Sequence, residues 1–573
     1  MDDEIVSRRT WQKVPPIPQF EDNSRTFSSV CAASLMFHRP VAFWLGTLLI
    51  TAGVLSHVPM FLMGRYTGWQ MVGMEMTVEM WIGMALIPLG LLLAWRGLLS
   101  PVKAVPGGGG EVPHFHIADG VSLNREHWKL VVVLVITLAI DVMKPATLGF
   151  VMPGMGREYE IVRSQASLLA LFALTGTTVG SVVWGRIADR VGRRAAILLS
   201  ALMFIGTAIC GAMPAFEWNL VMCFLMGASA GGLLPITFTL MAETVPARHR
   251  GWLLVALGGI GTSAGYLLAS GAAALLEPLF SWRVLWLLGL PTGAVIIFLN
   301  RYIPESPRFL SAMGRNAAAV AVLARFAGHR RGVEKDDETH PPAEPIDESH
   351  PVATVRQLLQ GRHARITLAL LACGTGWGLV NFGFLLWLPS NLKELGVDPA
   401  AASALLAKSA VYGLPAIAVV IWLYDRWSSF KTLIVFAALS TLTLLGFAAL
   451  GFWQVKSPWI TTTATALLLV SVSGVIAMLI PYAAEIYPVH LRGTGSGVIA
   501  ASSKFGGILG AGLAVVGFFD HLALSAALLA VPMAVAAVML WMGGIETRGI
   551  KLEEIQRTLA SPGRAAAKGH RAA

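Results

Sequence analysis

A motif that occurs twice constrains the architecture of this chain more than any other feature. The pattern Glu-x-x-Pro-x-x-x-Arg-Gly begins at Glu243 and again at Glu485, 242 residues later. Two shorter pairs keep nearly the same offset: Asp-Arg at Asp189 and at Asp425, and Glu followed by Ser or Thr at Glu305 and at Glu546. Long apolar segments fill the space between these motifs. The order and spacing therefore indicate an internal duplication whose repeat unit is a membrane bundle.

The composition supports an integral membrane protein. Hydrophobic residues make up 55% of the chain and charged residues only 13%, against roughly a quarter charged residues in soluble domains. Apolar runs of about 20 residues, the length that spans a bilayer, are expected near 41–63, 77–95, 130–152, 167–184, 195–213, 220–241, 252–275, 284–302, 367–388, 404–423, 432–452, 460–483, 498–518 and 522–541. We therefore predict an all-α membrane protein with two six-helix bundles, related by a pseudo-two-fold axis, and two additional N-terminal helices.

The predicted organisation has five parts. They are 1–128 (N-terminus, two additional helices and a linker), 129–303 (first bundle), 304–365 (polar cytoplasmic linker), 366–543 (second bundle) and 544–573 (cytoplasmic tail). Neither linker is expected to form a folded domain. Most Lys and Arg residues fall in loops on one side, so we expect both termini in the cytoplasm and the protein in the inner membrane. These basic residues are spread over many short loops, which argues against nucleic-acid binding.

One loop carries the resemblance to a known family. The sequence Gly185-Arg-Ile-Ala-Asp189-Arg190-Val-Gly192-Arg193-Arg194 resembles the signature loop between the second and third helices of the major facilitator superfamily. The residues from Glu243 to Gly251, from Pro304 to Arg308 and from Glu546 to Gly549 resemble the sugar-porter-type branch of metabolite transporters. The resemblance extends roughly from Leu130 to Ile555.

The resemblance implies a salt-bridge network at the cytoplasmic side that latches the outward-facing state. Its expected members are Gly185, Asp189, Arg190, Gly192, Arg193, Arg194, Glu243, Arg250, Glu305, Arg308, Asp425, Arg426, Glu485, Arg492, Glu546 and Arg548. The alternative is that these charges only anchor the helices at the membrane surface. The second signature loop, from Asp425 to Lys431, lacks the glycine, which leaves its latch role open.

The chain also departs from two branches of the superfamily. Hexose porters carry glutamines in the seventh helix, where this chain has Gly374-Thr-Gly-Trp377-Gly-Leu-Val-Asn381-Phe-Gly383. Drug antiporters carry a Gly-Pro signature in the fifth helix, whereas the stretch from Gly258 to Gly265 contains no proline. A hexose substrate and drug export are therefore both disfavoured.

Charged residues inside the predicted helices are the main functional candidates, because charges at bilayer depth are costly. Asp141 and Lys144 are spaced i to i+3, so they share one helix face and can pair. Pro145 follows and frees the carbonyl of Asp141 from helical hydrogen bonding. Burial favours the protonated form of Asp141, whereas Lys144 favours the carboxylate. We predict that Asp141, with Lys144, couples protons to transport; a static buried ion pair is the alternative.

The substrate site is predicted around a second buried cation. Lys504 lies among small residues of the eleventh helix, and together with Lys144 it favours a substrate with a carboxylate. Trp377 and Asn381 are expected to supply stacking and hydrogen bonds. The alternatives are that Lys504 pairs with a lipid or a helix carbonyl, and that Trp377 faces lipid.

Methionines gather in the two additional helices. Thioethers suit Cu(I), so Met71, Met74 and Met76 form a weak alternative metal site, although methionine is also a common filler. Docking of another membrane protein, or dimerisation, is the favoured role of these helices.

The sequence therefore predicts a secondary active transporter that takes up a small organic acid or related metabolite with protons, by alternating access. The alternatives are a porter of polyols or other neutral solutes, a copper importer, and a non-transporting receptor or assembly subunit. No cofactor is expected. An enzyme is disfavoured because no nucleophile–base set or phosphate-binding loop is recognisable.

Overall fold

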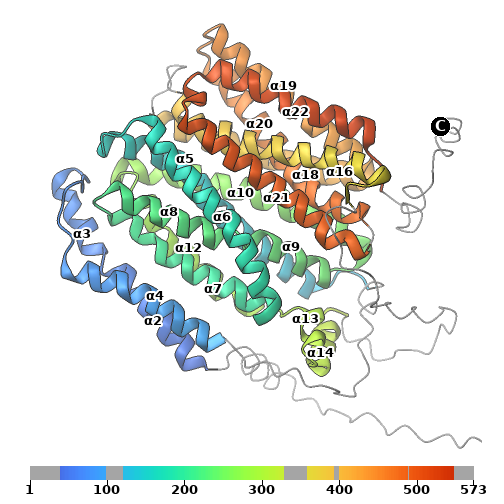
Figure 1. Ribbon diagram of the computed structural model, residues 1–573, viewed down its shortest axis with the longest axis horizontal. Coiled ribbons are helices and arrows are strands. Elements are labelled where there is room, and N and C mark those ends of the chain that lie inside the picture. Colours follow the sequence, from blue (N-terminus) through green and yellow to red (C-terminus); the bar gives the residue numbers. More distant parts are fainter. Residues whose placement is uncertain (1–38, 99–120, 328–357, 393–398, 488, 548–573) are drawn as a thin grey trace, which may run out of the picture.

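The computed structural model describes residues 39–98, 121–327, 358–392, 399–487 and 489–547. Fourteen helical segments in these ranges are long and apolar enough to cross a membrane. The predicted all-α architecture of twelve helices plus two is confirmed. Figure 1 shows the two bundles side by side, the first in teal to green and the second in yellow to red.

The two additional helices precede the first bundle. They comprise α2 (Pro40–Leu55), α3 (Val58–Met63), the 3-10 turn η1 (Gly64–Thr67) and α4 (Val78–Leu98). The first bundle contains α5 (Arg125–Glu158), α6 (Arg163–Val191), α7 (Arg193–Gly206), η3 (Thr207–Ala212), α8 (Phe216–Ala230), α9 (Leu233–Thr244), α10 (Ala247–Phe280), α11 (Val284–Leu287), α12 (Gly289–Leu299) and η4 (Asn300–Tyr302).

The second bundle follows the linker. It contains α16 (Gly361–Gly378), the π-helical segment η5 (Leu379–Leu385), α17 (Leu386–Asn391), α18 (Pro399–Arg426), α19 (Ser429–Phe452), α20 (Pro458–Ile486), α21 (Val489–Val515), η7 (Phe518–Asp520) and α22 (Leu522–Gly543). The bundles meet where α10 packs against α18 and α20, where α6 packs against α21, and where α5 touches α17.

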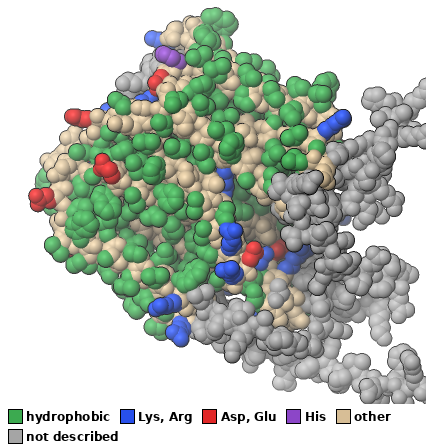
Figure 2. Space-filling model, viewed as in Figure 1, with side chains coloured by type: hydrophobic (Ala, Val, Ile, Leu, Met, Phe, Trp, Pro, Cys, Tyr) green, Lys and Arg blue, Asp and Glu red, His purple; other side chains and the backbone are tan. Residues whose placement is uncertain are grey.

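The helices run between two ends of the molecule, the linker end and the far end. The linker end holds α13 (Pro307–Ala312) and α14 (Asn316–Ala327), and the far end holds η1, Glu158 and η7. Figure 2 shows a largely hydrophobic face between the two ends, with Lys and Arg side chains gathered beside a hollow near the linker end. This distribution is what a bilayer-spanning bundle requires.

The described part of the linker contains two short helices, α13 and α14. Arg325 of α14 lies 2.5 Å from Glu126 at the start of α5. The Asn124 side chain also donates to the Phe326 carbonyl at 2.5 Å. Helices α13 and α14 therefore dock onto the first bundle, whereas residues 328–357 lie outside the described residues.

The additional helices form a tight pair. A Cβ on Gly90 of α4 would lie 2.6 Å from the Gly46 carbonyl oxygen of α2. The absence of side chains here allows the two backbones to touch, as is common between membrane helices. The pair packs against α7, and Figure 1 shows it along the side of the first bundle away from the second.

A buried ion pair fixes the loop of this pair to the first bundle. The Arg283 side chain is fully buried and lies 2.7 Å from Glu158, the last residue of α5. The Met71 amide donates to the same carboxylate at 2.7 Å, and Trp282 Nε1 donates to it at 2.9 Å. Glu158 therefore joins α5, the segment before α11 and the loop before α4.

We predict that Glu158→Gln destabilises the protein by about 3–5 kcal/mol, because Arg283 would keep a buried charge without its partner. The apparent melting temperature in detergent should fall. Glu160→Gln is the matched control, since Glu160 is exposed two residues further on. Equal melting temperatures for the two variants would contradict this role of the ion pair.

Candidate functional site

The charged pair predicted on the first repeat helix is present and buried. Lys144 Nζ lies 3.6 Å from Asp141 Oδ1, with side-chain exposures of 0% and 6%. The ammonium sits 3.7 Å from the ring centroid of Phe204 on α7. Lys144 therefore points into the first bundle, where a cation–π contact holds it. This orientation separates Lys144 from the contact between the bundles.

Lys504 approaches the same carboxylate from the second bundle. Its ammonium donates to the Gly231 carbonyl of the first bundle at 3.2 Å. It is also near enough to Asp141 for each charge to stabilise the other. Asp141 thus interacts with two cations, and one of them, Lys504, crosses the contact between the bundles.

A break in a helix makes the Gly231 carbonyl available. Helix α8 ends at Ala230 and α9 begins at Leu233, so the carbonyl is not used by a continuous helix. Ser181 donates to the same oxygen at 2.8 Å. Pairing of Lys504 with a helix carbonyl, the alternative left open by the sequence, therefore coexists with its approach to Asp141.

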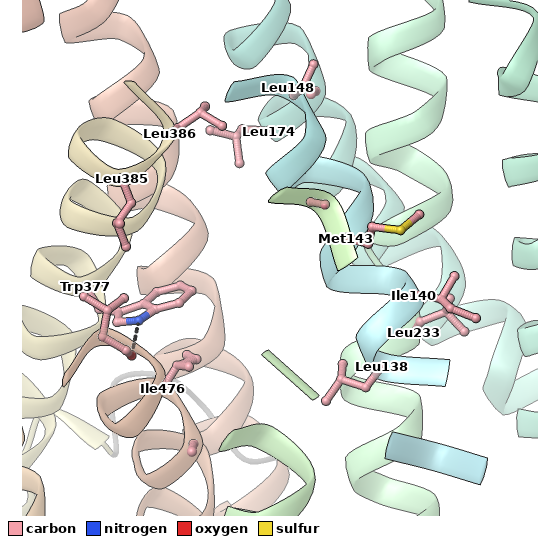
Figure 3. Packing of buried hydrophobic residues seen from close by; sticks show 14 of the residues in the cluster. Leu138, Ile140, Met143, Leu148, Leu174, Leu233, Trp377, Leu385, Leu386 and Ile476 are labelled. Carbon is pink, nitrogen blue, oxygen red and sulfur yellow. Dashed lines mark hydrogen bonds between the residues drawn. The ribbon is translucent and has the colours of Figure 1, made fainter. Parts of the chain in front are cut away.

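Trp377 lies inside the protein and does not face lipid. It is 7% exposed, its Nε1 donates to the Val472 carbonyl at 2.8 Å, and Figure 3 shows its ring directed toward α5, which carries Leu138 and Met143. Asn381 is half-buried on the π-helical segment η5. Such segments are rare and are often found at functional sites.

A carboxylate caps α7 at the linker end of the first bundle. Glu305 Oε1 accepts hydrogen bonds from the backbone N–H groups of Arg193, at 2.7 Å, and Ser306, at 3.0 Å. Burial raises the pKa of Glu305, and these N–H groups offset the rise only in part. An acceptor at this position satisfies amides that a helix N-terminus leaves unpaired.

The Arg193 side chain extends this cluster. Its guanidinium lies 3.5 Å from Glu243 and 3.8 Å from Asp189, and the Ser306 hydroxyl donates to Glu243. Asp189 is 76% exposed, so water screens its attraction to the Arg193 guanidinium. The Arg193–Glu243 contact is the drier of the two.

The second bundle repeats the arrangement with hydroxyl groups. Glu546 accepts from the Ser429 amide at 3.3 Å, from the Ser429 hydroxyl at 3.0 Å and from the Ser428 hydroxyl. The Thr547 hydroxyl donates to Glu485 at 2.6 Å, as Ser306 does to Glu243. Ser428 and Ser429 stand where the first bundle has Gly192 and Arg193, so hydroxyls replace the guanidinium.

The other residues expected in the latch differ in their surroundings. Asp425 and Arg426 are exposed and lie 3.8 Å from each other, outside the Glu546 cluster. Arg190 and Arg308 are also exposed, Arg194 is partly buried, and Arg250 donates to the Val245 carbonyl at 3.4 Å. The side chain of Arg492 and all of Arg548 lie outside the described residues.

Four hydroxyl residues of these clusters were not among the predicted site residues: Ser306, Ser428, Ser429 and Thr547. The repeat could have indicated two of them, because Ser306 and Thr547 each follow a glutamate at the same position of the two repeats. Arg163 at the far end was missed as a site residue too. Its partners are distant in sequence and no repeat marks them.

The methionines proposed as an alternative metal site serve in packing. Met71 is fully buried, and a Cβ on Gly64 would lie 2.7 Å from its methyl group. Met74 and Met76 are partly buried against the hydrophobic core. Within the described ranges, no group of three or more His, Cys, Asp or Glu side chains is placed to hold a metal ion.

The fold and the charges at the contact between the bundles define a class of membrane protein, the secondary transporters built from two repeated helical bundles. The family model "Major Facilitator Superfamily" matches residues 133–511. The chain belongs to this superfamily, and it is a transporter and not an enzyme. The predicted resemblance is confirmed.

Similar proteins agree with this assignment. The chain is 27% identical to the 4-hydroxybenzoate transporter PcaK of Acinetobacter baylyi over 432 residues, which cover 74% of this chain and 93% of that one. It is also 27% identical to the niacin transporter NiaP of the same organism over 446 residues, 76% of this chain and 98% of that one. A gallate transporter of Pseudomonas putida is 27% identical over 438 residues, with coverage of 74% and 94%.

A solved structure shares the fold. The xylose transporter XylE from E. coli, in a partially occluded inward open conformation, superposes with a TM-score of 0.59 at 16% identity. The match covers 75% of this chain and 100% of XylE. The two additional helices, α2 and α4, precede residue 133, where the match to the family model begins.

We predict that Gly192→Ala destabilises the linker end by about 1–3 kcal/mol, a typical cost of backbone strain. Gly192 has a φ of +107°, and a Cβ there would meet the Glu305 carboxylate. Gly185→Ala, in the α6 part of the same signature motif, is the control, because its Cβ would meet nothing within 4 Å. The half-life of the folded protein on heating, followed by gel filtration, should shorten only for Gly192→Ala, and equal half-lives would contradict the capping role of Glu305.

Proposed function

We propose that this transporter takes up a small aromatic carboxylic acid together with protons. The observation that carries the proposal is the Asp141 carboxylate between Lys144 and Lys504, where the bundles meet. The names of the similar transporters, for 4-hydroxybenzoate, niacin and gallate, all refer to aromatic rings that bear a carboxyl group. Lys504 of the second bundle can bind the carboxylate of such a substrate, while Asp141 of the first bundle can take up a proton.

Charge balance links the binding of the proton to the binding of the substrate. A proton on Asp141 removes the negative charge that Lys504 shares, and leaving a buried cation unpaired is unfavourable. A substrate carboxylate can restore the balance by binding Lys504 with a charge-assisted hydrogen bond. Proton and substrate would then favour each other's binding, which is the linkage that symport requires. A neutral polyol would leave Lys504 without a counter-charge.

The two lysines differ in their suitability for the substrate. Lys144 is enclosed between Asp141 and Phe204, so its proposed role is to adjust the charge state of Asp141. Lys504 is the proposed substrate cation. Because Trp377 Nε1 already donates to Val472, Trp377 would offer its ring face, and Asn381 its amide.

We place the linker end in the cytoplasm, with both termini on that side and the protein in the inner membrane. The basic residues near α13 and α14 support this orientation. The proposed latch of the outward-facing state centres on Glu485, whose Oε1 would lie 3.0 Å from a Cβ on Gly251 of the first bundle. The cluster around Glu243 is proposed to support this contact from within the first bundle. A partner protein or dimer contact through α2 and α4 stays a prediction.

We predict that Asp141→Asn abolishes uptake driven by a pH gradient but preserves exchange of labelled for unlabelled substrate. Asparagine keeps the shape of the side chain and removes its ability to carry the coupled proton. Uptake and exchange would be measured in proteoliposomes with labelled 4-hydroxybenzoate and nicotinate. Glu217→Gln, at an exposed carboxylate on α8, is the control and should behave as the unmodified protein. Persistent pH-driven uptake in Asp141→Asn would rule out the coupling role.

A further inference from the structure

One arginine at the far end joins the two bundles. Arg163 is the first residue of α6, in the first bundle. Its guanidinium donates to the Asn391 side-chain oxygen, lies 4.9 Å from the ring centroid of Trp387, and its Nε is 3.5 Å from Asp520 Oδ1. All three partners belong to α17 or η7 of the second bundle.

The three contacts differ in their exposure to water. Asn391 is fully buried and Trp387 is 2% exposed, whereas the Asp520 side chain is 51% exposed. An exposed ion pair contributes little because water screens it. The charge-assisted hydrogen bond to buried Asn391, with the stacking on Trp387, is therefore expected to dominate the interaction.

An apolar contact closes the same end. Figure 3 shows Leu386 of α17 and Leu174 of α6 directed toward each other. A Cβ on Gly149 of α5 would lie 2.5 Å from the Leu386 carbonyl oxygen. The bundles thus touch at the far end through both apolar and polar contacts, and Trp377 lies on the linker side of this closure.

The contacts of Arg163 differ in kind from the bonds that cap α7 and α19 at the linker end. The bonds of Glu305 to Arg193 and Ser306 join residues of the first bundle, and those of Ser428 and Ser429 to Glu546 join residues of the second. Such bonds can persist while the bundles move as rigid bodies. The contacts of Arg163 cross between the bundles, so opening of the far end must break them.

We propose that Arg163 is the latch of the far end. Its contacts with Asn391, Trp387 and Asp520 hold that end closed, and their loss shifts the population toward the state open at the far end. The latch acts opposite to the proposed linker-end latch. It depends on alternating access alone, and not on the identity of the substrate or on proton coupling.

Cross-linking across the closure tests this proposal without substrate. The reporter protein would carry Leu174→Cys and Leu386→Cys after replacement of the native cysteines Cys31, Cys210, Cys223 and Cys373 by serine. A short bifunctional thiol reagent would be applied to membranes, and the initial cross-linking rate measured. Arg163→Ala should lower the rate about tenfold, the effect expected when a hydrogen bond to a charged group is lost.

Two further variants serve as a matched control and as a test in which the cross-linking rate should change in the opposite direction. Arg157→Ala removes another arginine near the far end, one that donates within its own helix to Pro153, and should leave the rate unchanged. Asn391→Asp should raise the rate, because a carboxylate binds the guanidinium more strongly.

Equal rates for Arg163→Ala and Arg157→Ala would overturn the proposal. If Arg163→Ala does not fold, Asn391→Asp decides alone: a raised rate supports the latch, and an unchanged or lowered rate overturns it.

Discussion

The ion pair of Asp141 with Lys144, approached by Lys504 from the other bundle, is the interaction on which the rest of the structure depends. Each charge is costly at this depth, and the Asp141 carboxylate lowers the cost of both cations. Lys144 is fixed within the first bundle by Phe204, whereas Lys504 crosses from the second. A change in the charge of Asp141 therefore acts directly on a contact between the two moving bodies, and this connection underlies the proposed coupling.

The duplication explains why each bundle has a glutamate and hydroxyl cluster at the linker end. In both, a glutamate that follows the last helix of the bundle accepts from the first amides of α7 or α19, and a neighbouring hydroxyl donates to the motif glutamate. The first bundle adds the Arg193 guanidinium, next to Gly192 with its positive φ. The second bundle has Ser428 and Ser429 at these positions, and their hydroxyls donate to Glu546. The second cluster therefore forms without the signature glycine.

Much of this was predictable from sequence because it rests on local rules. The number of helices follows from apolar length, and the Asp141–Lys144 pair from i to i+3 spacing. The approach of Lys504 to Asp141, the Met71–Glu158 bond and the Arg163 contacts were not predictable, because residues far apart in sequence meet only through tertiary packing. The docking of linker helix α14 at Glu126 and Asn124 is likewise a tertiary contact that the sequence pattern does not indicate.

The most direct test of the central claim is proton movement in proteoliposomes that contain a pH-sensitive dye, on addition of 4-hydroxybenzoate, nicotinate, xylose or a polyol. The proposed mechanism predicts acidification of the proteoliposome interior with an aromatic carboxylate, and none with the neutral solutes. Substrate accumulation without proton movement, or acidification with a neutral solute, would contradict coupling through Asp141 and Lys504.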